Sequence, residues 1–264
     1  MTETLSTNGT PASAQQLEEW VEAFHRDGFL FLPEVLPLDL VAQLRADLDG
    51  ALEEADAVKN KILELRMRMF EISAANVSLF DREPITGFAE ALVAPDCHVI
   101  HNNSFRTPTG AGISGWHQDD APHLIVTHGE PPTNIRLPVL LFTANYYLTD
   151  VLSVENGPTQ VIPGSHLFGA PCPSSMEGAP QEKDIFSCLG KAGSVVMFNN
   201  QVWHRGATNT SEQTRYMTQI SYARRLIGHK YFPFMNYQMP AHIYENANPR
   251  LKRLLGFLPS GAYG

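Results

Sequence analysis

Cysteine is scarce in this sequence and has none of the spacings that hold metals or crosslink small domains. The three cysteines, Cys97, Cys172 and Cys188, lie far apart, and no CxxC pair occurs. Closely spaced cysteine pairs are typical of zinc ribbons and disulfide-stabilised domains. We therefore expect neither a cysteine-ligated zinc site nor a disulfide framework, and a reducing compartment is favoured.

Positive charge is also in short supply. The 264 residues include 19 Lys and Arg against 28 Asp and Glu, which gives a formal net charge of −9. Nucleic acids and anionic membranes attract proteins with an excess of basic residues. The sequence therefore argues against a nucleic-acid or membrane partner, although a locally basic pocket for an anionic small molecule remains compatible with it.

Long apolar runs, internal repeats and linker-like segments are absent as well. The polar stretch Met1–Ser13 lacks a basic region followed by an apolar one, so we expect no signal peptide, no membrane span and a cytoplasmic protein. Residues 1–14 are rich in Thr, Ser, Asn and Ala, which predicts a disordered tail. Residues 15–264 are expected to form one domain, since 43% of the chain is hydrophobic.

The first third of the chain has helical periodicity. Apolar residues recur at steps of three and four after Ser13-x-x-Gln16, a sequence that resembles a capping box, and again after Pro37. A short buried strand is expected at 29–33. The charge pattern of 59–70 predicts a further helix, and another helix is expected at 84–93.

From Cys97 onward the period changes to two, and Gly, Pro and Asn turns separate short apolar segments. This pattern predicts a mostly β protein with helical cover, as an antiparallel sandwich or barrel. A last helix is expected near 248–255. The expected strands are 97–106, 116–119, 136–148, 159–163, 193–198, 202–207 and 214–224.

One polar motif stands out among these strands, Gly115-Trp-His-Gln-Asp-Asp120. His117 and Asp119 are two residues apart, so an extended backbone projects both side chains to the same face. A ferrous site of the 2-His-1-carboxylate type needs this pair and one more imidazole, and it leaves positions open for substrates. The pair alone is weak evidence, because H-x-D occurs by chance in many proteins.

Among the ten histidines, His204 is the best candidate for the third ligand. It follows the predicted strand 193–198 directly, and a jelly roll can bring such a residue to face the H-x-D pair. Arg215 lies in the strand after it. A guanidinium grips a carboxylate through two hydrogen bonds, as an oxygenase that uses 2-oxoglutarate requires for the far carboxylate of this co-substrate.

These motifs together resemble the phytanoyl-CoA dioxygenase-like (PhyH) family of Fe(II)/2-oxoglutarate-dependent oxygenases. The resemblance implies a double-stranded β-helix, also called a jelly roll or cupin-like fold, with Fe(II) bound by His117, Asp119 and His204 and 2-oxoglutarate bound by Arg215. The matching segments run in the family's order: Phe24–Pro33, Trp116–Asp119, Tyr147–Asp150, Glu155–His166, Gly193–Phe198 and His204–Arg215.

Further contacts to the co-substrate are implied by the same resemblance. Thr159 and Asn145 occupy positions that touch 2-oxoglutarate or line its pocket in relatives. On the strand before the H-x-D motif, period two lets only one of Asn103 and Ser104 face inward, and Asn103 is favoured.

The implied enzyme is a non-haem iron dioxygenase that uses O2 and 2-oxoglutarate, aided by ascorbate in an assay, to hydroxylate an unactivated C–H bond. A small molecule of secondary metabolism is the expected substrate. The presence of Asp119 favours hydroxylation over halogenation, since halogenating relatives lack this carboxylate. The oligomeric state stays open, with a homodimer as one alternative.

Three other interpretations remain at this stage. The same iron site could carry out desaturation, epoxidation or ring rearrangement. A jelly-roll binding protein with a vestigial site is the non-enzymatic alternative, and the filled ligand positions argue against it. A cupin-like zinc or manganese enzyme is the third alternative, and it would have no use for Arg215.

Overall fold

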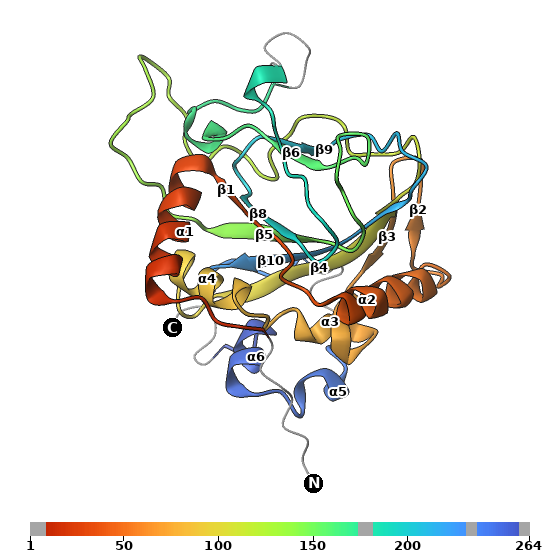
Figure 1. The fold of residues 1–264 in the computed structure, drawn as a ribbon. Helices are drawn as coiled ribbons and strands as arrows, with labels where there is room; N and C mark the ends of the chain where they lie inside the picture. Colours follow the sequence, from red (N-terminus) through yellow and green to blue (C-terminus); the bar gives the residue numbers. More distant parts are fainter. Residues whose placement is uncertain (1–8, 174–181, 231–236, 259–264) are drawn as a thin grey trace.

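Two antiparallel sheets face each other, with the smaller one lying over one end of the larger (Figure 1). The computed structural model describes residues 9–173, 182–230 and 237–258. The large sheet has the order β1 (Phe29–Leu32), β8 (Val195–Asn199), β5 (Leu141–Tyr147), β10 (Arg215–Ala223), β4 (His98–Thr107), β3 (Glu64–Met67) and β2 (Val58–Lys59). The small sheet has the order β7 (Phe186–Ser187), β6 (Thr159–Val161) and β9 (His204–Gly206).

This arrangement of two facing antiparallel sheets is a jelly roll, as expected from the sequence. An isolated antiparallel bridge between His117 and His204 extends the small sheet beyond β9. The segment around His117 therefore acts as the edge strand of the small sheet, although its strand character is limited to that bridge.

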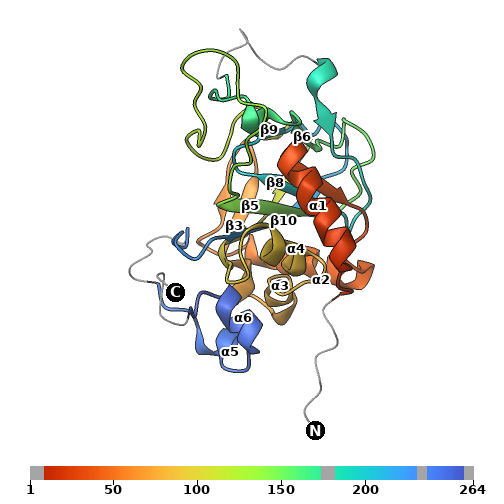
Figure 2. The ribbon, with the colours of Figure 1, turned by 90° about the vertical axis from the view of Figure 1, so that its left-hand side faces the viewer.

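Helices cover the face of the large sheet that points away from the small sheet (Figure 2). Phe24 of the first helix packs edge-on against Phe88 and Phe142, and Phe142 stacks on Tyr222, so helices and sheet share one core. The helices are α1 (Ala14–Asp27), α2 (Leu38–Ala51), α3 (Ala74–Ser78), α4 (Ile85–Leu92), α5 (Ala241–Tyr244) and α6 (Pro249–Leu254), with 3-10 turns at Met69–Glu71, Ser165–Leu167 and Glu182–Asp184.

Helix α1 begins and ends where its sequence predicts. The Ser13 hydroxyl accepts a hydrogen bond from the Gln16 amide and the Gln16 side chain caps Ser13 in return, which is the expected capping box. Gly28 ends the helix with φ of 80°, a left-handed conformation that glycine adopts without strain. A Cβ there would lie 2.6 Å from His166 Nδ1, so the turn that holds His166 packs directly on this helix end.

The helix predicted for residues 59–70 is wrong. This segment contains β2 and β3, and β3 pairs with β4 so that Leu65 lies opposite Phe105. Leu63 and Leu65 pack toward the inside, while Glu64 on the other side forms an ion pair with Arg106. The alternation of charged and apolar residues is therefore of period two, and pairing with the edge of β4 decided the conformation.

Other expected elements differ in their boundaries. The strand predicted for 136–148 is shorter, since β5 covers Leu141–Tyr147, all of whose residues are buried. The predicted disordered tail falls largely on residues 1–8, which lie outside the described part of the chain, and Ala14 already belongs to α1. Within the described ranges, no helix combines the length and apolar character needed to cross a bilayer.

Candidate metal centre and anion site

The edge of the small sheet brings two imidazoles together. His117 and His204 exchange both backbone hydrogen bonds of an antiparallel pair, at 3.0 and 2.8 Å, and their ring centroids are 4.3 Å apart. Two residues further along, the Asp119 amide donates to the Asn200 carbonyl at 2.9 Å, which fixes the position of its carboxylate. The strand register thus converts residues that are distant in sequence into one cluster.

The carboxylate completes a compact donor set. Asp119 Oδ1 lies 3.5 Å from His204 Nε2 and 4.0 Å from His117 Nε2, and one ligand atom from each residue lies within 4.8 Å of the other two. No other cluster of His, Cys, Asp or Glu with such geometry was found among the described residues. These are the three side chains that the sequence singled out.

Backbone carbonyls orient both rings. His117 Nδ1 lies 2.9 Å from the Gly115 carbonyl and His204 Nδ1 lies 2.9 Å from the Val202 carbonyl. A carbonyl only accepts, so each Nδ1 carries the proton and each Nε2 presents a free lone pair to the cluster. This tautomer is the one needed to bind a metal ion through Nε2.

The protonation states also suit a divalent cation. Burial lowers the pKa of His117, and the neighbouring His204 lowers it further, so the His117 ring is neutral at neutral pH. Burial alone would raise the pKa of Asp119, but the adjacent His204 and His117 rings and the charge of Lys230 hold it below its ordinary value. Two imidazoles and one carboxylate form the donor set of non-haem Fe(II) sites, so the residues fit this ion.

Arg215 lies nearby in an unusual state for an arginine. Its side chain is buried, with 3% of its surface exposed, and it forms no ion pair with any carboxylate in the described ranges. Its Nη atoms donate to the Gly157 carbonyl and, at 3.1 Å, to Thr107 Oγ1, while Nε has no partner. Burial lowers its pKa to about 10, so it stays charged at neutral pH. An uncompensated buried cation fits an anionic ligand.

The triad and Arg215 line the same cavity, which we call the inner cavity. It measures about 220 Å³ and lies between the two sheets. Among the other predicted contacts, Thr159 of β6, Asn145 of β5 and Asn103 of β4 also line it. Ser104 points the other way and donates to Thr218 Oγ1 at 2.8 Å, so the side chain facing the cavity from this strand is Asn103.

Several lining residues were not predicted from the sequence. Gln219 of β10 lies in register between Asn103 and Asn145, and its Nε2 donates to Asn145 Oδ1 at 3.1 Å. Counting in steps of two from Arg215 would have found it. The apolar part of the wall consists of Leu63, Leu65, Phe105, Ile113, Phe198 and Met217.

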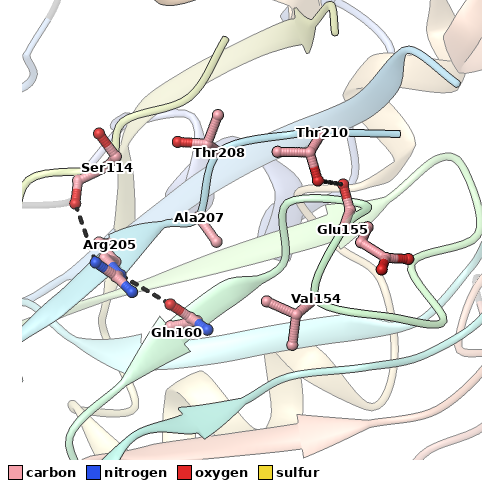
Figure 3. A pocket seen from close by; sticks show the side chains of 8 residues that line it. All are labelled: Ser114, Val154, Glu155, Gln160, Arg205, Ala207, Thr208 and Thr210. Atoms are coloured by element: carbon pink, nitrogen blue, oxygen red, sulfur yellow. Dashed lines mark hydrogen bonds between the residues drawn. The ribbon is translucent and has the colours of Figure 1, made fainter. Parts of the chain in front are cut away.

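A second, separate pocket lies on the other face of β9 and is called the outer pocket here (Figure 3). It measures about 280 Å³, and Arg205 reaches into it beside Gln160 and Ser114. Its remaining lining residues are Val154, Glu155, Ala207, Thr208 and Thr210. Since neighbouring residues of a strand point to opposite faces, His204 and Arg205 serve different sides of the same sheet.

The fold and the donor set define a class, a jelly-roll protein with a 2-His-1-carboxylate site and a buried arginine beside it. The family model for phytanoyl-CoA dioxygenase (PhyH) matches residues 24–217, and the chain belongs to this family.

Curated relatives agree with this assignment. An ectoine dioxygenase of Nocardia farcinica is 25% identical over 224 residues, covering 72% of this chain and 72% of the relative. The iron/alpha-ketoglutarate-dependent dioxygenase penM of Penicillium thymicola is 23% identical over 249 residues, covering 87% and 74%. The expected enzyme class, a non-haem iron dioxygenase that depends on 2-oxoglutarate, is thereby confirmed.

Solved structures share the fold. The epimerase SnoN, in complex with Fe3+, alpha ketoglutarate and nogalamycin RO, has a TM-score of 0.64 at 19% identity, with 90% of this chain and 94% of that chain covered. HygX from Streptomyces hygroscopicus, with nickel and 2-oxoglutarate bound, has a TM-score of 0.63 at 18% identity, with 84% and 89% covered.

Proposed function

We propose that this enzyme hydroxylates an unactivated C–H bond of a small molecule, with Fe(II) bound by His117, Asp119 and His204 and 2-oxoglutarate held at Arg215. The observation that carries the proposal is that a three-residue donor set and an uncompensated buried guanidinium share one cavity. Bound Fe(II) supplies the oxidising chemistry, in which O2 converts 2-oxoglutarate to succinate and CO2 while the substrate is oxidised.

The side chains of this site have distinct tasks in the proposal. Arg215 neutralises and orients the far carboxylate of the co-substrate, and Thr159, on the strand opposite, adds a hydroxyl to the same grip. Asn145 and Asn103 contribute amide hydrogen bonds to the co-substrate.

The metal ligands differ in their access to solvent. His204 is buried, so its side of the cavity excludes water, whereas His117 and Asp119 are more exposed and face the open side.

The shape of the inner cavity supports a substrate with an apolar part. Leu63 and Leu65 of β3 and Ile113, just before the H-x-D motif, line the cavity beside the amides, and Ile113 is 38% exposed. An apolar wall with a few fixed polar groups is typical of small-molecule sites. We further propose that the substrate belongs to secondary metabolism and that the enzyme is cytoplasmic, as expected from the sequence.

A second outcome of the same chemistry is retained because of two structural neighbours. SnoN is described as an epimerase and SnoK as a carbocyclase, both alpha ketoglutarate dependent and from nogalamycin biosynthesis. Desaturation, epoxidation or ring rearrangement by this chain would need the same residues in the same places. The outcome depends on where the substrate carbon lies, which the loops around the cavity determine.

Turnover of the co-substrate tests the proposal directly. Purified protein is incubated with Fe(II), ascorbate and 2-oxoglutarate, and succinate is measured while small molecules are screened for stimulation. We expect succinate with Fe(II) and none with Zn(II), followed by a product heavier by one oxygen atom. Succinate release that is independent of Fe(II), or that persists in His117→Ala, would refute the proposed site.

A further inference from the structure

The two halves of the metal centre differ in how firmly the fold holds them. His204 is buried and belongs to β9, which pairs with β6 on its other side. His117 and Asp119 lie in a segment without regular strand structure, and their side chains are 37% and 28% exposed. The half at the open edge therefore needs support from outside the cavity if the three ligand atoms are to stay together.

The register of the small sheet places such support directly behind the ligands. Because His117 and His204 are an antiparallel pair, Trp116 and Arg205 are the neighbouring cross-strand pair and point to the opposite face. There the Arg205 guanidinium lies over the Trp116 ring, with its Cζ atom 4.7 Å from the ring centroid. Cross-strand pairs of this kind stabilise a particular register.

Arg205 is itself held in place by one strand and by the segment before the H-x-D motif. Its Nε donates to Gln160 Oε1 of β6 at 2.8 Å, and one Nη reaches the Ser114 carbonyl at 3.5 Å, as Figure 3 shows. Gln160 is buried and its Nε2 donates onward to Ser187 Oγ of β7 at 2.9 Å. A chain of contacts thus runs from β7 through β6 and β9 to the segment that carries His117.

We infer that Arg205 and Trp116 form a clamp on the outer face of the small sheet that holds His117 at metal-binding distance from His204. Trp116 is not among the residues that line the inner cavity. Arg205 borders this cavity, but Gln160 and the Trp116 ring engage its guanidinium, so both residues are positioning residues. Arg205 faces no carboxylate within ion-pair distance in the described part of the chain, which leaves its charge available for the indole ring. The inference rests on the proposed metal site.

Loss of a half-buried cation–π contact should weaken metal binding about 3- to 30-fold. We expect this increase in the dissociation constant for Co(II), used as a visible-light probe of the site, in Arg205→Gln and Trp116→Ala. Arg205→Lys and Trp116→Phe should recover part of the affinity, since they keep a cation and an aromatic ring. The Co(II) ligand-field spectrum of the weakened variants should also change, because the His117 ring is less well fixed.

A matched control separates the clamp from general stabilisation. Arg45 lies over the Tyr216 ring at 4.8 Å, a similar contact on helix α2 and far from the small sheet in Figure 1. Arg45→Gln should leave Co(II) affinity and spectrum unchanged, while thermal unfolding of the metal-free proteins reports any loss of stability in each variant. If Arg205→Gln binds Co(II) as tightly as Arg45→Gln and with the wild-type spectrum, the clamp is refuted.

The proposed function can fail separately from the clamp. Wild-type protein that bound no Co(II), or bound it equally well after His117→Ala, would overturn the metal site itself and the clamp with it. Wild-type protein that binds Co(II) through His117, together with unaffected Arg205 and Trp116 variants, would overturn the clamp and leave the metal site intact.

Discussion

Arg215, from β10 of the large sheet, lies against the inner face of the small sheet, whereas Arg205, from β9, extends from its outer face. Their surroundings differ in a way that separates ligand binding from support. Arg215 projects into the inner cavity, buried and without a carboxylate or a partner for Nε. Arg205 projects into the outer pocket, where Gln160 and the Trp116 ring engage it and water reaches part of it. Burial lowers the pKa of both guanidinium groups.

The two guanidinium groups differ in the partners that the protein supplies for their charge. A buried charge without a partner destabilises a fold unless a ligand supplies the opposite charge, which supports the proposed binding role of Arg215. A half-buried guanidinium with an amide and an aromatic face is already satisfied by the protein, so Arg205 marks a structural contact. The two arginines thus have different roles, and mutation of each face can test whether binding and support are separate.

Removal of a ligand from the inner face should have the largest effect. In His204→Ala, we expect metal uptake and succinate release to fall to the background level, because two donors cannot replace the three-residue set. Metal content after reconstitution and succinate release are the measurements. His123→Ala, which removes an imidazole 3.6 Å from Asp120 and outside the donor set, is the control. Normal metal uptake by His204→Ala would show that the metal ion is not bound by this donor set.

Replacement of Arg215 should weaken co-substrate binding and spare the fold. For Arg215→Met, we expect KM for 2-oxoglutarate to rise about 10- to 100-fold, as for the loss of charged hydrogen bonds. The free energy of unfolding of the ligand-free protein should stay within about 1 kcal/mol of wild type, since an uncompensated charge is removed along with its hydrogen bonds.

Thermal unfolding with and without 2-oxoglutarate gives the second readout for this variant. The co-substrate should raise the melting temperature of the wild type and leave that of Arg215→Met unchanged, because a ligand stabilises only the state that binds it. A large loss of stability without ligand would mean that Arg215 is structural, and the contrast with Arg205 would disappear.

His101 is a half-buried base that loses its charge within the ordinary pH range, whereas Arg215 stays charged there. Burial lowers its pKa to about 4, and Asn103 donates to its Nε2 at 3.0 Å. In the unfolded chain the His101 ring binds a proton near pH 6.5, whereas in the folded protein it does so only near pH 4. The free energy of unfolding should therefore decrease as the pH falls from about 6.5 to about 4. We expect about 2 kcal/mol of this loss to vanish in His101→Gln, measured by denaturant unfolding at pH 7 and pH 5. An unchanged pH dependence would contradict the assignment.

On the outer face, Arg205→Met should reverse the pattern of Arg215→Met. We expect a decrease of about 1 kcal/mol in the free energy of unfolding, because a cation–π contact and a hydrogen bond are lost. KM for 2-oxoglutarate should stay within about threefold of wild type at saturating metal, because Gln160 and the Trp116 ring already engage the guanidinium. Denaturant unfolding and co-substrate titration are the measurements. A KM as high as that of Arg215→Met would show that the two faces are coupled.

The sequence was sufficient to select the three candidate ligands and Arg215 because these residues follow local rules. Two residues spaced by two on an extended segment share a face, and a histidine after one predicted strand and an arginine within the next match the order of family motifs. The helix start at Ser13 was likewise local, since a capping box involves only four residues. Such features need no knowledge of which strands are neighbours.

The sequence was insufficient where strand pairing determines the conformation or the contacts of a segment. The β2–β3 hairpin was predicted as a helix because its charges alternate, and only its pairing with β4 makes it a strand. The Trp116–Arg205 pair becomes visible only through the register of neighbouring strands. Register depends on contacts between residues far apart in sequence, and local periodicity does not contain it.

The smallest effect is expected where the two faces meet, at Gly206 of β9. A Cβ there would lie 3.5 Å from Arg215 Nη2 and 3.8 Å from Nη1, which are ordinary contact distances, so Gly206→Ala should fold normally. The added methyl group would narrow the space beside the guanidinium. We therefore expect KM for 2-oxoglutarate to rise about three- to fivefold, a smaller effect than the loss of a charged hydrogen bond.

Gly228→Ala is the matched control, since a Cβ at that position meets nothing within 4 Å. Co-substrate titration and Co(II) titration of both variants then locate the effect of the methyl group. A higher KM with unchanged Co(II) affinity would place the methyl group on the ligand side of β9, next to Arg215. Weaker Co(II) binding with unchanged KM would mean that β9 transmits strain to His204, because the same strand carries Arg205 on its other face. The two faces would then be one mechanical unit, and the separation between binding and support would not hold.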